Sequence, residues 1–505
     1  WMSSTRKRAR GAMPMAAGVV VSASVLVCGS VMPAVADDEV IVDQGAVSAA
    51  GAGSWQSVDE SVSTAPSELA AKVDANDKAR VVALRDENGV PTFDVTNVKG
   101  KAQAEAVVAQ VQAKDETLAV AVEEKQKLIT STPGQAQATN DPSWGSQWAL
   151  TKLNAESAWQ IASGSGQTVA IVDTGTSAEP DLAPALLTGW DFVTDQEGGH
   201  GDQNGHGTHV AGIVAAAAGN AVGGSGLAPG AKLLPVRALD AAGAGYWSDI
   251  ASGIIYAVNQ GAGVINLSLG GHSDDPNLKA AVDYATSNGR TVVAAVGNDG
   301  SGALTYPAAY PGVIGVAAST QSDGIASFSN YGPAVDVAAP GVGILSTVPG
   351  GYASMSGTSM AAPFVSASAA LVRSAAVSRG LGAVNVEAVL AATATDLGSP
   401  GKDLYSGSGR INPRAAMCGA GACAVGLNPT YTVKKHKITV RLNRSAVQEV
   451  VLQKKIGKAW KSVTVKLTGA NGVVSFKVKR GASYRYLIPT TTATLMAKGK
   501  LIRVR

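Results

Sequence analysis

The chain contains few residues of the types that usually bind transition metals. Among its 505 residues there are three cysteines and five histidines. His206 and His209 stand three positions apart, a spacing that two zinc ligands can have, but no third histidine or cysteine follows at ligand spacing. We therefore interpret His209 as a structural residue and expect no zinc site.

Long apolar runs are also rare. One runs from Met15 to Val31, after a basic stretch with Arg6, Lys7, Arg8 and Arg10, and before Ala34-Val35-Ala36. A basic start, an apolar centre and a small-residue cleavage site are typical of an export signal, so we interpret residues 1–36 as one. No later stretch is long and apolar enough to span a bilayer, and we expect a secreted mature protein without a transmembrane anchor.

Two cysteines remain after this signal. Cys418 and Cys423 flank the short segment 419–422, which consists of glycine and alanine. In an oxidising compartment these two thiols are expected to form a disulfide. The alternative is a pair of free surface thiols.

The composition predicts a large core and several structural units. Of all residues 46% are hydrophobic and only 16% are charged. From residue 140 to about 417, predicted strands (168–172, 232–238, 263–269, 291–296) alternate with predicted helices (207–218, 248–259, 277–288). This alternation predicts an α/β domain, a parallel sheet flanked by helices on both faces, with its functional site at the carboxyl ends of the strands.

Three short motifs occur in a fixed order along this region. They are Asp173-Thr174-Gly175, His206-Gly207-Thr208-His209, and the segment 357–363, which reads Gly-Thr-Ser-Met-Ala-Ala-Pro around Ser359. A serine hydroxyl becomes a nucleophile when an imidazole takes its proton, and a carboxylate orients that imidazole. Ser359 opens a predicted helix that runs to about Ser378, so backbone N–H groups there would favour developing negative charge.

Asn298 follows the predicted buried strand 291–296. An amide at such a strand end can donate a hydrogen bond to the oxygen that becomes negative in a tetrahedral intermediate. The alternative is a plain turn, which the sequence Asn298-Asp299-Gly300 would also form.

The motifs and their order resemble those of the subtilisin-like serine proteases, the subtilases. The resemblance implies a secreted serine endopeptidase that works through an acyl-enzyme intermediate. Asp173, His206 and Ser359 would be its triad, with Asn298 and the Ser359 N–H as the oxyanion hole. Two alternatives are a non-catalytic binding protein with a protease-like shell, and a Ser-Glu-Asp peptidase of similar fold. The latter class also uses a Gly-Thr-Ser motif but places an acid where this chain has Asn298.

The resemblance also implies how substrate would be held. Two small-residue segments would flank an extended peptide, Trp247 would line an apolar pocket upstream of the cut, and three residues would form the primary pocket. These residues are Gly243, Ala244 and Gly245; Ser268, Leu269 and Gly270; and, in the primary pocket, Ala295, Gly297 and Thr305. We expect a broad, mainly apolar preference.

A structural calcium ion is implied by the same resemblance. Asp141, Asp181 and Asn220 match positions that hold calcium in many subtilases, and carbonyl oxygens of the loop 218–224 would complete an all-oxygen set. The alternative is three unrelated surface polar residues.

Residues 37–139 are expected to form a propeptide, a small α+β unit. They contain predicted strands at 80–84 and 117–122 and a predicted helix at 102–113. By resemblance, this unit would assist folding and inhibit the enzyme, and its tail near 128–140 would lie in the active-site groove until Ser359 cuts it. The chain would therefore be an autoprocessed zymogen.

The last part differs in charge. After a linker at 418–426, residues 427–505 contain 18 lysines and arginines and a single acid, Glu449, a net charge of +17. Alternating stretches such as 437–442 and 473–478 predict a small antiparallel β-rich domain, a sandwich or a barrel. Such a charge fits a solvated surface, or adhesion to an anionic cell-envelope polymer or an acidic substrate. Nucleic acid is not expected as a partner of an exported chain.

Overall fold

The computed structural model of the chain describes residues 5–6, 55–74, 76–127, 132–136, 143–422, 430–434, 436–442, 449–456, 459–468, 473–488, 497–498 and 502–504. The chain divides into two compact units, 1–124 and 125–505. Apart from residues 5–6, the expected export signal lies outside the described residues.

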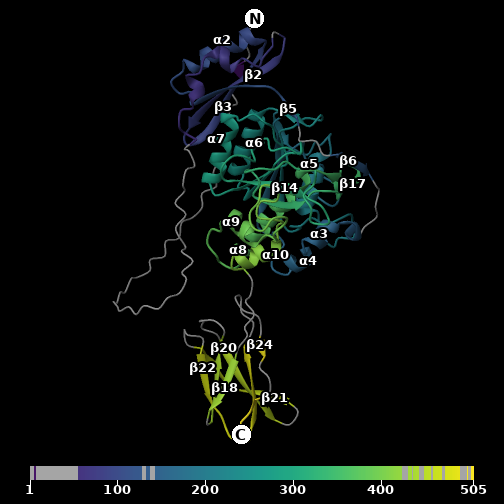
Figure 1. The fold of residues 1–505 in the computed structure, drawn as a ribbon, viewed down its shortest axis with the longest axis vertical. Coiled ribbons are helices and arrows are strands. Elements are labelled where there is room, and N and C mark those ends of the chain that lie inside the picture. Colours follow the sequence, from purple (N-terminus) through teal and green to yellow (C-terminus); the bar gives the residue numbers. More distant parts are fainter. Residues whose placement is uncertain are drawn as a thin grey trace, which may run out of the picture. The chain divides into compact units, whose positions relative to one another are not determined.

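The first unit is a small antiparallel sheet packed against one helix (Figure 1). Its strands are β1 (Thr5–Arg6), β2 (Lys78–Glu87), β3 (Val90–Lys99) and β4 (Ala119–Glu123), in the order β1-β3-β2-β4. The helix α2 (Lys101–Gln112) buries Ala104, Val108 and Val111 against the sheet, while η1 (Glu60–Val62) and α1 (Pro66–Leu69) lie between β1 and β2 in the sequence. This is the α+β arrangement expected for 37–139.

Strand β3 was not among the predicted strands. It pairs with β2 over ten residues through a turn at Asn88 and Gly89, whose φ angles are 59° and 80°. Positive φ at both positions is the geometry of the two-residue turn that Asn-Gly favours. The Asn-Gly pair was thus a usable signal for the missing strand.

The second unit contains the predicted parallel sheet. Its order is β15-β14-β13-β12-β7-β10-β8-β9, and the neighbours are parallel except for β8 and β9. The strands are β7 (Thr168–Asp173), β8 (Gly189–Asp191), β9 (Gln196–Gly198), β10 (Lys232–Arg237), β12 (Val264–Leu267), β13 (Thr291–Ala295), β14 (Val313–Ser319) and β15 (Val337–Pro340).

Helices cover both faces of this sheet, which confirms the α/β prediction. On one face α5 (His206–Ala215) and α8 (Thr358–Ser378) share a core with Val169 and Ile171 of β7. On the other, Gly253 of α6 (Trp247–Asn259) faces Val172 and Val236. The remaining helical elements are η2 (Ser143–Ser146), α3 (Trp148–Lys152), α4 (Ala155–Trp159), α7 (Pro276–Ser287), α9 (Val386–Thr393) and α10 (Pro413–Gly419).

Contrary to the expectation that no later stretch is long and apolar enough to span a bilayer, helix α8 meets that test by length and composition, and no other helix among the described residues does. Some 89% of its apolar window is buried inside the unit, however, so it is the central core helix of a folded domain.

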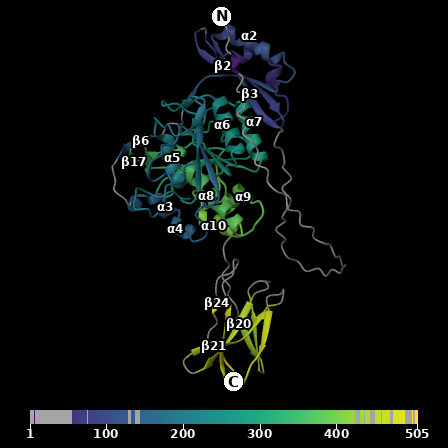
Figure 2. The same cartoon turned by 180° about the vertical axis from the view of Figure 1, so that it is seen from behind.

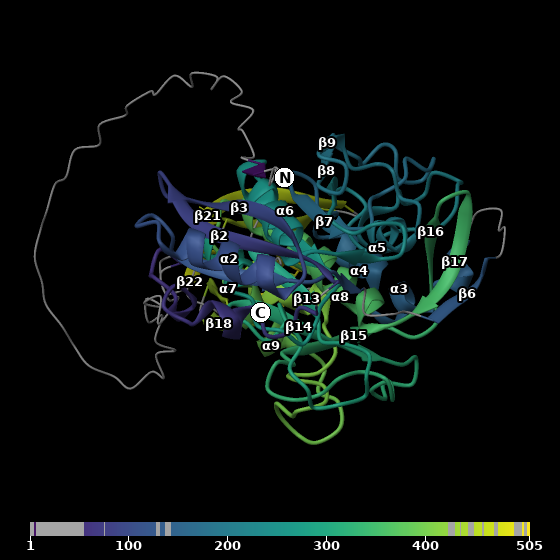
Figure 3. The same cartoon turned by 90° about the horizontal axis from the view of Figure 1, so that it is seen from above.

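Two small sheets flank this core. Strand β5 (Gln126–Lys127) pairs with β11 (Ala244–Gly245), and β6 (Thr132–Ala136) pairs with β17 (Gly351–Ser356), which also pairs with β16 (Ile344–Val348). Figure 3 shows β6 alongside β17. Segments 126–127 and 132–136 therefore belong to the second compact unit, although they fall inside the region predicted as propeptide.

The described residues after 429 form two antiparallel sheets around a separate core (Figure 2). One consists of β18 (Thr430–Lys434), β19 (Lys437–Arg441) and β22 (Val473–Lys477). The other consists of β20 (Glu449–Ile456), β21 (Ala459–Leu467), β23 (Ser483–Ile488), β24 (Ala497–Lys498) and β25 (Ile502–Arg503). Two packed antiparallel sheets are a sandwich, one of the two forms predicted from the alternating stretches.

Candidate active site

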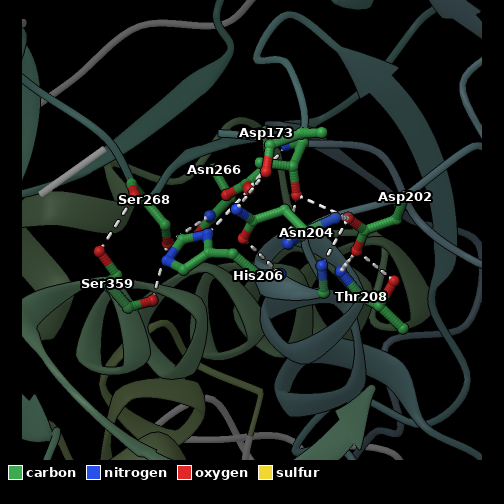
Figure 4. Close-up of polar contacts among 12 residues, drawn as sticks. Asp173, Asp202, Asn204, His206, Thr208, Asn266, Ser268 and Ser359 are labelled. Carbon is green, nitrogen blue, oxygen red and sulfur yellow. Dashed lines mark hydrogen bonds and ion pairs between the residues drawn. The ribbon is translucent and has the colours of Figure 1, made fainter. Parts of the chain in front are cut away.

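Asp173 and His206 meet at the carboxyl edge of the parallel sheet (Figure 4). Asp173 ends β7 and is fully buried, and its Oδ1 lies 2.8 Å from His206 Nδ1. The same oxygen accepts a hydrogen bond from the Thr174 N–H at 2.7 Å. Gly207 makes this approach possible, because a Cβ there would lie 2.1 Å from the Gly175 carbonyl oxygen. The carboxylate therefore holds the imidazole in one orientation.

His206 is itself buried, with 3% of its surface exposed. Burial disfavours the imidazolium, but the charge and hydrogen bond of Asp173, together with the charge of Asp202, raise the pKa of His206 above its ordinary value. Among the described residues its Nε2 has no hydrogen-bond partner, and Figure 4 shows that edge of the ring facing Ser268 and Ser359. An imidazole held this way can accept a proton at Nε2.

Ser359 lies in the first turn of α8, and Ser268 binds it twice. The Ser359 hydroxyl donates to the Ser268 carbonyl at 3.0 Å, and the Ser268 hydroxyl donates to the Ser359 carbonyl at 2.8 Å. The second bond has a local cause: Pro363 stands four residues after Ser359 and has no N–H to give to the Ser359 carbonyl. Ser268 supplies the missing donor, which ties the start of α8 to the end of β12.

Asn298 follows β13 and is held by the same helix start. Its Oδ1 accepts hydrogen bonds from the N–H and the hydroxyl of Thr358, both at 2.9 Å. Because the amide oxygen and nitrogen point in opposite directions from one carbon, this contact directs Nδ2 away from Thr358. The residue before the serine thus determines the orientation of the asparagine amide.

The residues expected to form the primary pocket lie around Gly297. Thr305 Oγ1 accepts a hydrogen bond from Asn330 Nδ2 at 3.2 Å, and Ala295, Thr305 and Asn330 are all buried. Gly297 has φ 110°, and a Cβ there would come within 2.3 Å of Asn330 Nδ2. Only glycine fits between these polar groups. Asn330 was missing from the sequence analysis, since nothing in the chain near it indicates this contact.

The small-residue segment 243–245 is paired as a strand. Ala244 lies opposite Lys127 and Gly245 opposite Gln126, so the expected substrate edge is occupied by the chain's own residues. Trp247 is 2% exposed, and its indole edge and the Gln126 side chain both closely approach Gly271. Leu269 and Gly270 are likewise buried at the end of β12.

An ion pair reinforces this strand. Lys125 Nζ contacts the Asp240 carboxylate and lies 5.9 Å from the centre of the Tyr246 ring. Burial alone would raise the pKa of Asp240, but the hydrogen bond and charge of Lys125 and nearby backbone N–H groups lower it. The charge pair thus anchors the residue just before β5.

Asp202 is a further site residue that sequence reasoning missed. It is 6% exposed, and its Oδ1 accepts hydrogen bonds from the Thr174 hydroxyl at 2.9 Å and the Gly205 N–H at 2.8 Å. Its Oδ2 accepts from the Thr208 N–H at 2.9 Å and from the Thr208 hydroxyl. This carboxylate joins the segment after Asp173 to the helix that begins at His206 (Figure 4). Its position four residues before His206 was the sequence signal that could have identified it as a site residue.

A second buried polar chain lies under the serine. The Ser366 hydroxyl donates to Asn266 Oδ1 at 2.7 Å, and Asn266 Nδ2 donates to the Ser268 hydroxyl at 2.9 Å. All three side chains are fully buried. They fix the Ser268 hydroxyl, and through it the Ser359 carbonyl.

His209 and the cysteines have simpler surroundings. His209 Nε2 lies 3.0 Å from the carbonyl oxygens of Ile344 and Ala353, and burial lowers the pKa of His209 to about 3. A neutral ring that bridges β16 and β17 is a structural histidine, as predicted. Cys418 is disulfide-bonded, whereas Cys423, its predicted partner, lies outside the described residues.

The predicted calcium ligands are only partly described. Asp181 is fully buried, and its two oxygens accept hydrogen bonds from Asn220 Nδ2 at 2.8 Å and the Gly224 N–H at 3.0 Å. Asp141 lies outside the described residues. Within the described part of the chain, no three His, Cys, Asp or Glu residues gather into a metal-binding group. A cation at Asp181 would therefore need amide and carbonyl oxygens, a donor set that suits calcium.

Comparison with known proteins agrees with this geometry. The profile of the Subtilase family matches residues 164–409. The chain is 48% identical to thermitase of Thermoactinomyces vulgaris over 281 residues, which cover 55% of this chain and 98% of thermitase. It is 42% identical to a thermophilic serine proteinase of Bacillus sp. (strain AK1), covering 68% and 85% of the two chains. It is 46% identical to subtilisin Savinase of Lederbergia lenta, covering 53% and 97%.

Proposed function

The chain belongs to the subtilase family of serine endopeptidases, and from this premise we propose that Asp173, His206 and Ser359 form its catalytic triad. One observation carries the proposal: a buried carboxylate binds His206 Nδ1, while Nε2 has no partner among the described residues and faces the serine at the start of α8. Carboxylate, imidazole and hydroxyl are then in the order that makes serine nucleophilic.

The reaction begins with a rotation of the Ser359 hydroxyl, which donates to the Ser268 carbonyl in this structure. His206 Nε2 takes the hydroxyl proton as Oγ attacks the peptide carbonyl carbon. The resulting oxyanion receives hydrogen bonds from Asn298 Nδ2 and the Ser359 N–H. The imidazolium gives its proton to the leaving amine, and a water molecule then hydrolyses the acyl-enzyme by the same route.

A fluorophosphonate probe tests this assignment. The mature protein is expected to take up one phosphonyl group on Ser359, located by peptide mass spectrometry, and Ser359→Ala is expected to take up none. Labelling of another serine, or full activity in the alanine variant, would contradict the proposed nucleophile. A His206→Ala variant serves as a matched control, because it keeps the serine but lacks its base.

We also propose that the enzyme removes its own propeptide, the unit predicted at 37–139 after an export signal at 1–36, and that the cut falls several residues before the predicted boundary at 139. Strand β5 pairs with the substrate edge at Ala244–Gly245, and β6 pairs with β17, which leads directly to Ser359. The bonds between Lys127 and Thr132 connect these two strands, so cleavage is expected there. A Ser359→Ala precursor should stay intact, and N-terminal sequencing of the active protein should begin at one of the residues 128–132.

Substrates are expected to be extended peptides that take the place of β5. We propose that Gly243, Ala244 and Gly245 bind the peptide backbone opposite Ser268, Leu269 and Gly270, next to Trp247. Ala295, Gly297 and Thr305 would bind an apolar side chain at the cut. Profiling with a peptide library checks this, and a strong preference for acidic side chains at the cut would contradict it.

Calcium would be held by Asp181 and Asn220 with carbonyl oxygens of the loop 218–224, and by Asp141. Its role would be to hold the loop 218–224 together with the segment that contains Asp141. A chelator is expected to lower the melting temperature of the mature enzyme by several degrees, and added calcium should restore it. The same experiment on Asp181→Asn should show little change.

The remaining assignments concern location. We propose a secreted enzyme with a catalytic domain at 140–417, a linker at 418–426 closed by Cys418 and Cys423, and a basic domain at 427–505. Anionic cell-envelope polymer is the partner that the charge of this last domain favours. Fractionation of the producing cells tests the location.

A further inference from the structure

The three-stranded sheet of the basic domain presents a row of lysines. Lys434 of β18 lies opposite Lys437 of β19, and Lys437 lies opposite Lys477 of β22. All three are exposed, while the neighbours Ile438 and Phe476 point into the core. Because adjacent strands are about 4.8 Å apart, the three lysines stand side by side on one face of the sheet.

Such a row costs stability. Like charges directly opposite each other on an antiparallel pair are destabilising. The domain cannot neutralise them internally, since Glu449 is the one acid among residues 427–505 against 18 lysines and arginines. A bound anion would remove this repulsion.

The row borders a large open cleft of about 1160 Å³. Lys479 and Arg480 extend the positive charge beyond the end of β22, and His436 lies in the turn between β18 and β19. The cleft is thus lined by the three row lysines, His436, Val478, Lys479 and Arg480. Several cations around one hollow surface can contact successive charges of one polymer.

The rest of the same face is rich in hydroxyl groups. Thr432 lies opposite Thr439, and Thr439 lies opposite Ser475, with the last two hydroxyls 2.8 Å apart. The residues that share this face in the described strands include no aromatic ring, whereas proteins that bind single-stranded nucleic acid stack bases on such rings. Hydroxyls beside lysines suit a chain that carries both sugar or polyol groups and anions.

We propose that Lys434, Lys437 and Lys477, with Lys479 and Arg480, form a binding surface for an anionic glycopolymer, a sugar or polyol chain with repeating phosphate or carboxylate groups. The inference goes beyond peptide hydrolysis and holds whether or not the triad assignment is right. It names the surface and the chemistry of the partner, where total charge alone indicates only a general affinity for anions.

The test uses the full chain with Ser359→Ala, so that self-digestion does not interfere. Its row variant carries Lys434→Glu, Lys437→Glu and Lys477→Glu. The matched control carries Lys454→Glu, Lys455→Glu and Lys461→Glu on the five-stranded sheet. The control changes the net charge by the same amount and also removes a pair of opposed lysines, Lys454 and Lys461. On the other side of Lys454 the opposed residue is Tyr484, so no third lysine continues the row. None of the control residues lines the cleft.

Binding is measured to immobilised polyglycerol phosphate, to alginate and to duplex DNA at several salt concentrations. The row variant is expected to bind the first two at least about tenfold more weakly, with a shallower dependence on salt because fewer counterions are released. The control should lose less than about threefold. Melting temperatures and far-UV circular dichroism check that both variants fold.

Two results would overturn the proposal. Equal losses in the row and control variants would show that net charge, not this surface, determines binding. Tighter binding to duplex DNA than to the two glycopolymers would show that the partner class is nucleic acid. A failure of phosphonate labelling at Ser359 would leave these measurements unaffected.

Discussion

The α/β region and the C-terminal sheets differ in the burial and pairing of their charged side chains. In the α/β region, charged side chains near the site are buried and paired: Asp173 with His206, and Arg237 with Asp191 at 2.7 Å. In the C-terminal sheets, most of the described lysines are exposed, and lysines outnumber the acids by far across residues 427–505. Buried charges act through orientation, because their hydrogen-bond partners hold them in one geometry, whereas exposed cations act through number. The two regions are therefore expected to respond independently to mutation.

The largest effect is expected from Asp173→Asn. An amide cannot hold His206 in the required tautomer or stabilise its imidazolium, so kcat should fall by about 10⁴-fold. Retention on immobilised polyglycerol phosphate should not change. Loss of both peptide hydrolysis and retention would show that the two regions do not act independently.

A smaller loss is expected from Asn298→Ala. Removal of one oxyanion donor should lower kcat by about 10²- to 10³-fold and leave KM nearly unchanged. Thr358→Val is the control, since it removes only the hydroxyl that binds Asn298 Oδ1 and keeps the N–H. It should cost less than about tenfold. A rise in KM without a fall in kcat would contradict the proposed role of Asn298.

Asp202→Asn is expected to change the pH profile of kcat/KM. The base must be neutral, so activity rises with pH as His206 loses its proton, and the charge of Asp202 helps to raise the pKa of His206. Removing that charge lowers the pKa, and the acid limb should move to lower pH. Stability should fall by about 1–3 kcal/mol, because hydrogen bonds to a buried carboxylate are lost.

Thr208→Val separates these two effects of Asp202. It removes the hydroxyl that binds Asp202 but keeps the carboxylate charge, so the melting temperature should fall while the acid limb stays in place. An unchanged pH profile of kcat/KM in Asp202→Asn, with only a lower melting temperature, would show that the role of Asp202 is structural.

The smallest effect on catalysis is expected from deletion of Leu427–Arg505. Hydrolysis of a short peptide should stay within about twofold, because the residues proposed for the triad and the pocket all lie before Met417. Cell-associated activity should move into the medium. Loss of peptide hydrolysis in a folded truncated protein would show that the two regions depend on each other.

Much of the fold and of the candidate site could be predicted locally. The apolar run 291–296 predicted β13, which spans Thr291–Ala295, and Ser359 was expected at the start of α8, which begins at Thr358. Helix α5 was predicted at 207–218 but spans His206–Ala215, because Ala216 leaves the helical conformation at ψ 139°. Strand β3 was missed although its Asn-Gly turn was visible. Both differences concern elements whose conformation is determined mainly by residues close together in the sequence.

The contacts that complete the site could not be predicted in this way. Asn330 reaches Gly297 and Thr305 from a loop distant in sequence, and Ser268 supplies the hydrogen bond that Pro363 removes from α8. The pairing of β5 with β11 brings residues 126–127 beside Ala244–Gly245, the proposed substrate edge, across more than a hundred positions. Each contact depends on how distant segments pack.

The sequence by itself determined the chemistry: a carboxylate, an imidazole and a hydroxyl in an ordered set of motifs, and a basic C-terminal region. Residue types and local conformational preferences are sufficient for this. Only the tertiary structure decided which second carboxylate supports His206, which residues surround Gly297, and that three lysines stand in one row. Burial, register and distance arise when the whole chain folds, because they are properties of residue pairs that lie far apart along it.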